Sequence, residues 1–174
     1  MQIVTATTLA LILSLGGFIA MNTQVAQKAT AEIQNSSGKS LGTLTLFQEG
    51  EGVRISGRLS GLPAGRHAMH IHATGQCHAP DFKSAGAHFN PYGKKHGTQN
   101  KDGPHAGDLP NFTVLEDGVA VFDFTASLVT LRSGKNSLFI TGGTCLVIHQ
   151  NEDDEVTDPA GNAGDRIACG VIQK

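Results

Sequence analysis

Eight histidines fall between His67 and His149 in this chain of 174 residues, and several are spaced as metal ligands can be. A strand through His70-Ile71-His72 would place both imidazoles on one face and the isoleucine on the other. Taken alone, such a pair is more often two ordinary surface histidines. The chain then supplies three more imidazoles and a carboxylate, at His88, His96, His105 and Asp108. Three imidazoles and one carboxylate make a plausible four-coordinate zinc set, and imidazole suits copper as well.

A further histidine ends a short apolar segment. Residues 144–149 (Thr-Cys-Leu-Val-Ile-His) are typical of a buried strand, so His149 would join His70 and His72 if their strands are close. A planar, nitrogen-rich set of this kind favours Cu(II). His67 and His78 fit neither group, and we expect them to be ordinary surface or near-surface histidines.

Short β-rich segments between turns are expected to position these residues. The chain has 22 glycines and no tryptophan, and no window shows sustained helical periodicity. We predict an all-β sandwich or flattened barrel of about eight strands. Two long polar segments, 73–112 and 150–166, interrupt the strands and are expected to be functional loops. The predicted strands cover residues 43–48, 53–59, 66–72, 119–125, 138–141, 145–149 and 167–172.

The N-terminus has the composition of an export signal. The first 21 residues carry no charge, residues 9–20 are almost entirely apolar, and Ala29-Thr30-Ala31 is a small-x-small pattern of the kind that signal peptidases cut. We therefore expect a signal peptide at 1–31 and one domain at 32–174, secreted or periplasmic. An uncleaved membrane anchor over residues 3–21 and a wrongly chosen start codon are the alternatives.

Charge and cysteine content narrow the class of protein. A net charge of −2 and a pI near 6.4 argue against a nucleic-acid partner, and no stable membrane partner is expected if the signal is cleaved. Three cysteines allow one disulfide in an oxidising compartment. Cys77 and Cys169 lie in loop-like settings and are the better pair. Cys145 lies in the apolar segment and is expected to behave as a small hydrophobe.

Several of these motifs, in order and at matching spacing, resemble one family. From about residue 31 onward the chain resembles the secreted bacterial branch of the copper–zinc superoxide dismutases. The resemblance implies an eight-stranded Greek-key β-barrel or sandwich with two long functional loops, copper and zinc as cofactors, and conversion of superoxide to oxygen and hydrogen peroxide. It rests on residues 70–72 (HIH), 86–91 (GAHFNP), 105–111 (HAGDLPN), 147–149 (VIH) and 161–172 (GNAGDRIACGVI).

The resemblance also implies a role for individual residues. His88 would bridge the two metals and supply a proton to the outgoing peroxide. Arg166 would hold the anion near copper, and Asp153 would link the two metal sites from outside them. Cys77 and Cys169 would form a disulfide. The remaining copper ligands would be His70, His72 and His149, and the remaining zinc ligands would be His96, His105 and Asp108.

Two questions stay open at the level of sequence. The alternative function is a copper- or zinc-binding module without turnover, although all seven ligand positions are filled here. An oligomeric state is not indicated, and a homodimer is one option.

Residues 150–165 contain six carboxylates and no Lys or Arg, so we expect weak long-range steering of superoxide, with Arg166 supplying most of the attraction. Compensating charges could come from Lys94, Lys95 or Lys101.

Overall fold

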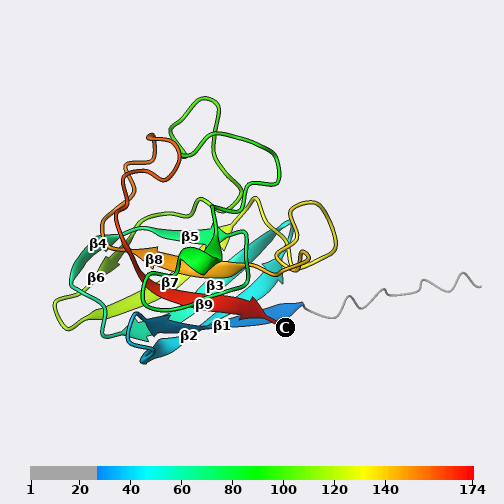
Figure 1. Cartoon of the computed structure of the whole chain (residues 1–174). Helices are drawn as coiled ribbons and strands as arrows, with labels where there is room; N and C mark the ends of the chain where they lie inside the picture. The colour runs from blue at the N-terminus through cyan, green and yellow to red at the C-terminus, as the bar shows by residue number, and fades with distance from the viewer. Residues whose placement is uncertain (1–26) are drawn as a thin grey trace, which may run out of the picture.

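The computed structural model describes residues 27–174 and shows a curled antiparallel sheet with its long loops gathered at one end (Figure 1). One short 3₁₀ helix, η1 (Lys83–Ala85), lies within the first long loop. Within the described part of the chain, no helix has the length and apolar character that a membrane crossing requires. The strands are β1 (Lys28–Asn35), β2 (Ser40–Glu49), β3 (Gly52–Ser60), β4 (Gly65–His67), β5 (Met69–His72), β6 (Phe112–Val114), β7 (Val119–Ala126), β8 (Cys145–His149) and β9 (Arg166–Gln173).

Seven strands form one sheet in the order β5-β8-β9-β1-β2-β3-β7, and β4 pairs separately with β6. Because β6 also contacts β7 and β4 directly precedes β5, the β4–β6 pair lies between the two edges of the curled sheet. Ala68 divides β4 from β5: its N–H donates to the Asn151 carbonyl, and its carbonyl accepts from the His149 N–H, at 2.8 and 2.9 Å. The all-β prediction is confirmed, and β4 with β5 make the single expected strand 66–72.

Alternating apolar side chains fill the inside of the curled sheet. Leu44 and Leu46 of β2 and Ile55 and Leu59 of β3 are fully buried and belong to one continuous core. Their period of two is the reason these segments form strands with one face inside. Gly57 lies on the same side of β3 as Ile55 and Leu59. A side chain does not fit there, because a Cβ would lie 2.8 Å from the Thr43 carbonyl oxygen. The two sheet neighbours therefore approach closely at this point.

One predicted strand is absent from the structure, and one short observed strand was not predicted. Residues 138–141 form turns instead of a strand, although Leu138 is fully buried. Its N–H donates to the Thr130 carbonyl at 2.9 Å, so a loop, and not a sheet ladder, supplies this part of the core. Strand β6 was not predicted, because its three residues are too few to show an alternating pattern.

Strand β1 (Lys28–Asn35) was not predicted, and its first half lies in the segment that we expected to be a signal peptide. Lys28 pairs with Phe47 and Ala31 with Leu44 on β2, and Ala31 also pairs with Ile172 on β9. The small-x-small pattern at 29–31 is therefore part of β1, and the expected boundary between residues 31 and 32 falls inside this strand. The rest of the expected signal segment, residues 1–26, lies outside the described residues.

A chain that starts at Glu32 is expected to be less stable than one that starts at Lys28. The shorter chain loses half of a strand that pairs on both sides, together with the buried side chains of Ala29 and Ala31. We expect a loss of about 2–4 kcal/mol in the free energy of unfolding. Urea denaturation of both metal-free chains measures this difference. Equal midpoints and slopes would show that residues 28–31 do not belong to the stable domain.

Candidate metal centre

The free edge of β5 holds the first long loop in place. The Ile71 N–H donates to the Gly107 carbonyl at 2.9 Å, and the Ile71 carbonyl accepts from the Phe89 N–H at 2.8 Å. Gly107 in turn donates to the Phe89 carbonyl at 2.8 Å. These bonds extend the sheet by two short loop segments. They place His88 and Asp108, which flank them, next to the histidines of β5.

The first cluster contains four buried histidines contributed by β5, β8 and the loop. One ring nitrogen from each lies within 4.8 Å of the others. In residues 27–174, five buried side-chain nitrogen or oxygen atoms lack a hydrogen-bond partner, and four of them belong to this cluster. Buried polar atoms without partners are rare, so their convergence indicates a ligand. The four atoms are His70 Nδ1, His72 Nε2, His88 Nε2 and His149 Nε2.

Hydrogen bonds on the opposite ring nitrogens orient three of these imidazoles. His72 Nδ1 donates to the Gly86 carbonyl at 2.9 Å, and His149 Nδ1 contacts the Gly164 carbonyl at 3.3 Å. His70 Nε2 lies 2.7 Å from a carboxylate oxygen of Asp153. Each of these partners is an acceptor, so the proton stays on the outer nitrogen. The lone pair of the inner nitrogen is then free to bind a metal.

The second cluster combines three histidines with a carboxylate. His88 Nδ1 and His96 Nδ1 lie 3.0 Å from Asp108 Oδ1, and His105 Nδ1 lies 3.2 Å from it. A tetrahedral ion with ligand bonds of 2.0–2.1 Å separates its ligands by about 3.3 Å. The donor atoms therefore have the mutual spacing of a zinc coordination shell. The second oxygen of Asp108 accepts the backbone N–H groups of Gly97 and His105, both at 2.9 Å.

His88 belongs to both clusters through its two ring nitrogens. Nε2 is one of the unpartnered atoms of the first cluster, and Nδ1 is a member of the second. The structure thus brings together all seven residues that the sequence singled out as metal ligands. It groups them as the resemblance implies: His70, His72, His88 and His149 in one set, and His88, His96, His105 and Asp108 in the other.

Burial keeps three imidazoles of the first cluster neutral. It lowers the pKa of His149 to about 3 and that of His88 to about 4, and neighbouring imidazoles add to the effect in both cases. Burial also lowers the pKa of His72 well below its ordinary value. A neutral imidazole is the form that coordinates a metal. Near pH 7 these side chains therefore need not lose a proton before binding.

Asp153 connects the two clusters from outside, because it contacts ring nitrogens that are not among the converging donor atoms. Its two carboxylate oxygens lie 2.7 Å from His70 Nε2 and 2.9 Å from His96 Nε2. Burial opposes ionisation of this carboxyl, but the two histidines outweigh it and hold the pKa of Asp153 below its usual range. Sequence analysis did not find Asn111, whose side chain bonds the backbone N–H and carbonyl of Asp153, both at 2.8 Å. Asn111 ends the 105–111 motif, but its contact with Asp153 depends on the second loop, which is distant in the sequence.

We expected His67 to lie at or near the surface, and this prediction is wrong. It is buried and packs against Phe112, with ring centroids 5.9 Å apart. Its ring nitrogens lie 2.9 Å from the backbone carbonyls of His149 and Pro63. His67 therefore supports the strand end that carries His149. His78 is exposed, as expected.

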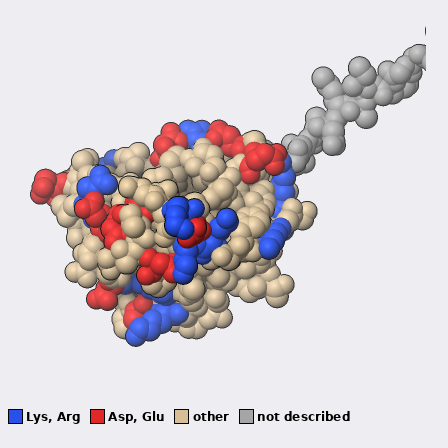
Figure 2. All heavy atoms as spheres, turned by 90° about the horizontal axis from the view of Figure 1, so that it is seen from above, with Lys and Arg blue, Asp and Glu red and all other residues tan. Residues whose placement is uncertain are grey.

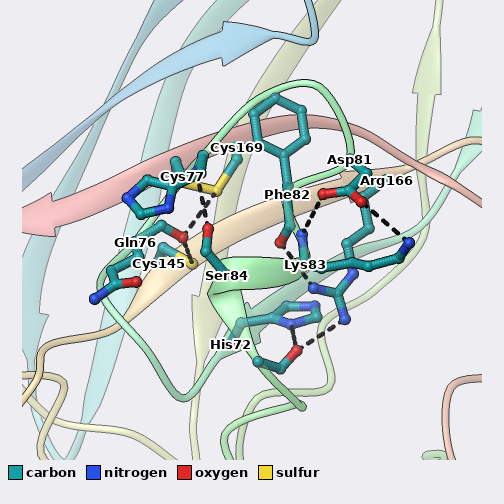
Figure 3. Close-up of a disulfide and its surroundings, with 12 residues drawn as sticks. His72, Gln76, Cys77, Asp81, Phe82, Lys83, Ser84, Cys145, Arg166 and Cys169 are labelled. Carbon is teal, nitrogen blue, oxygen red and sulfur yellow. Dashed lines mark hydrogen bonds and ion pairs between the residues drawn. A yellow bond between two sulfur atoms is a disulfide. The ribbon is translucent and has the colours of Figure 1, made fainter.

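Arg166 and the disulfide hold the same loop from two sides (Figure 3). The guanidinium donates from its two terminal nitrogens to the carbonyls of Phe82 and Gly86, both at 2.8 Å. The Gly86 carbonyl also accepts from His72 Nδ1, so it links Arg166 to the first cluster. Cys77 and Cys169 form a disulfide, which ties this loop to β9. The expected pairing of the cysteines is present.

Charges on the loop face are mixed rather than predominantly basic (Figure 2). Lys95 pairs with Asp158 at 3.0 Å, and Lys101 pairs with Asp102 at 2.8 Å. These lysines are therefore largely neutralised by carboxylates. The guanidinium of Arg166 instead donates to uncharged carbonyls and keeps its net positive charge.

Comparison with known proteins gives consistent matches. Residues 40–172 match the copper/zinc superoxide dismutase (SODC) family. Superoxide dismutase [Cu-Zn] 2 of Aquifex aeolicus is 52% identical over 148 residues, covering 84% of this chain and 86% of that protein. Superoxide dismutase [Cu-Zn] of Caulobacter vibrioides is 42% identical, covering 83% and 85%. A crystal structure of a SOD-like protein from Bacillus subtilis, a double mutant, superimposes with a TM-score of 0.80 at 38% identity, covering 83% of this chain and 97% of that one.

Replacing Gly161 with alanine is expected to weaken metal binding. A Cβ at this position would overlap Asp153 Oδ1 and lie 2.7 Å from His96 Nε2, so the carboxylate must leave one or both histidines. Loss of such an outer partner costs about 10- to 100-fold in metal affinity. Competition with a chelator measures the change for zinc and for copper.

Gly50→Ala is the matched control for this experiment. Gly50 has a similar φ, +56° against +62° for Gly161, and no atom lies within 4 Å of its Cβ position. It carries the backbone strain without the collision. Equal metal affinities in the two variants would show that Asp153 does not need its observed position.

Proposed function

This chain belongs to the copper/zinc superoxide dismutase family, and we propose that the two histidine clusters are the site where it converts superoxide to oxygen and hydrogen peroxide. The activity is that of an oxidoreductase with copper and zinc as cofactors. The observation that carries the assignment is the convergence of four buried, unpartnered ring nitrogens at one point, with one of those rings shared by a second cluster.

The donor sets fit the two metals. When bound, copper supplies the one-electron redox couple that dismutation requires, whereas zinc has no accessible second oxidation state. We assign copper to His70, His72, His88 and His149, because a set of four imidazoles suits it. We assign zinc to the set that contains Asp108, because three imidazoles and one carboxylate suit a tetrahedral ion. Because superoxide is a small anion, the site needs no large substrate pocket.

Arg166 is proposed to bind the superoxide anion. A guanidinium has five N–H donors, and two of them are used on the Phe82 and Gly86 carbonyls. The remaining donors are available to an anion. Because the side chain is half-buried and held at two points, the charge is fixed in orientation before the substrate arrives.

His88 is proposed to deliver a proton to the outgoing peroxide. Its Nε2 atom is buried in the first cluster and has no protein hydrogen-bond partner. Its Nδ1 atom faces the second cluster, so the ring keeps its position when Nε2 gains or loses a proton. The proton is thus held at a defined atom and not at a mobile solvent group.

Export fits the disulfide and the position of β1. A cysteine pair persists as a disulfide in an oxidising compartment, such as the periplasm or the extracellular space. We propose that any signal cleavage falls before Lys28, because cleavage after Ala31 would remove the first half of β1. Mass spectrometry of the mature N-terminus tests this placement.

His149→Ala is the test of the copper assignment. We expect this variant to lose copper, to keep zinc, and to lose at least about 100-fold in dismutation rate, because a direct ligand matters more than an outer partner. Metal analysis and a superoxide-decay assay give the two readouts. The exposed His78→Ala variant is the control and is expected to match wild type.

The same assay separates the enzyme from a non-catalytic module. Wild-type protein that binds both metals without accelerating superoxide decay would be such a module. Full activity in His149→Ala would remove His149 from the copper set.

Arg166→Ala is expected to slow dismutation about tenfold or more and to remove most of its salt dependence. The reason is that Lys95 and Lys101 already pair with carboxylates, whereas Arg166 does not. Rates measured between low and high ionic strength test this. The Arg166→Lys variant keeps the positive charge but loses the bidentate geometry, so we expect its rate to lie between those of wild type and Arg166→Ala. A large, salt-sensitive loss on replacing Lys94, Lys95 and Lys101 together with glutamine would instead assign steering to the lysines.

A further inference from the structure

A third cysteine lies beside the disulfide. The sulfur of Cys145 lies within 4.8 Å of both Cys77 Sγ and Cys169 Sγ, so three sulfur atoms form one compact group (Figure 3). Cys145 and Cys169 lie diagonally on the paired strands β8 and β9, where Cys145 is opposite Val171 and Cys169 is opposite Val147. The metal chemistry described above uses no member of this group.

The three sulfur-bearing residues differ in access to solvent. Cys145 and Cys169 are fully buried, whereas Cys77 is partly exposed. Cys77 also lines a surface hollow of about 230 Å³, together with Gln34, Ser40 and Gln173. A small thiol in solution can therefore reach the disulfide from the side of Cys77, but not from the side of its two buried neighbours.

We propose that Cys77 is a thiol-exchange site and that Cys145 is its internal resolving thiol. In the first step, the thiolate of a low-molecular-weight thiol attacks Cys77 Sγ, the bond to Cys169 breaks, and Cys169 leaves as a thiolate that takes up a proton. In the second step, Cys145 gives up its proton and attacks Cys77 Sγ, and the small thiol leaves. The product is a Cys77–Cys145 disulfide with a reduced Cys169, and no net oxidation or reduction has occurred.

Burial explains why the Cys77–Cys169 pair persists until an external thiol opens it. The Cys145 side chain donates only a weak hydrogen bond to the Gln76 carbonyl, with a sulfur–oxygen distance of 3.9 Å. Burial raises the pKa of this thiol to about 12, so almost none is present as the nucleophilic thiolate near pH 7. Opening the disulfide loosens the loop around Cys77 and lets solvent reach Cys145.

The exchange would keep the loop attached to the barrel. The existing disulfide ties residue 77 to β9, and the alternative ties it to the neighbouring strand β8. Both bonds close loops of similar length, so closure entropy scarcely favours either one. The loop carries the Phe82 and Gly86 carbonyls that hold Arg166. The anion-binding residue would therefore remain supported after thiol attack.

The first experiment treats the wild-type, metal-loaded chain with 2-mercaptoethanol and then blocks free thiols with acid and N-ethylmaleimide. Peptide mapping by mass spectrometry is expected to find a mercaptoethanol adduct on Cys77, followed by a growing Cys77–Cys145 linked peptide. An adduct that accumulates without this linked peptide would overturn the resolving role. No adduct at all, with Cys77–Cys169 intact, would overturn the exchange site.

The second experiment removes the competing partner. In Cys169→Ser, 2-hydroxyethyl disulfide is expected to modify Cys77 only briefly, because Cys145 then displaces the adduct. The matched control is Cys145→Ser/Cys169→Ser, in which the adduct has no internal nucleophile and should accumulate at least fivefold more. Zinc content confirms that both variants are folded. Equal adduct levels in the two folded variants would overturn the proposal.

Discussion

Two backbone hydrogen bonds between β5 and the first long loop, with a third inside that loop, underlie the whole centre. They run among Ile71, Phe89 and Gly107, and each of these residues is next to a metal-binding candidate. Without them, His88 and Asp108 would have no fixed relation to His70 and His72, and neither cluster would exist. Gly107 is required at this point because a Cβ there would collide with the Ile71 carbonyl. A short sheet extension thus does the positioning, and the long loop itself is free to remain irregular.

The buried histidines of this centre lower the stability of the metal-free protein. Four buried ring nitrogens have no protein partner, and leaving a buried polar atom unsatisfied costs about 1–3 kcal/mol. Metal binding would satisfy all four and would convert the cost into affinity. The hydrogen bonds that the opposite ring nitrogens donate to the Gly86 and Gly164 carbonyls and to Asp153 limit the cost further, because they satisfy those nitrogens and fix the tautomers. Stability and metal occupancy are therefore coupled in this protein.

Two shared acceptors join parts of the site that lie far apart in sequence. The Asp153 carboxylate contacts one histidine of each cluster, and the Gly86 carbonyl accepts from both His72 and Arg166. A shift of either histidine cluster would therefore disturb the other, and a shift of Arg166 would disturb the first cluster. The disulfide and the buried Phe82 side chain fix the loop segment between them. Structural and chemical roles therefore coincide in this loop.

Residue types and spacing alone determined the seven ligand candidates, the two long loops and the strand 145–149, because donor chemistry and alternating hydrophobicity are local properties. Tertiary structure decided everything that depends on a distant partner. β1 begins at Lys28 because β2 pairs with it there and β9 pairs with it from Thr30 onward, and Leu138 is buried by a turn instead of a strand. His67 is internal because the His149 carbonyl and Phe112 enclose it. The roles of Asn111 and Gly161 likewise arise only where the second loop folds against Asp153, and no local pattern in the sequence encodes that contact.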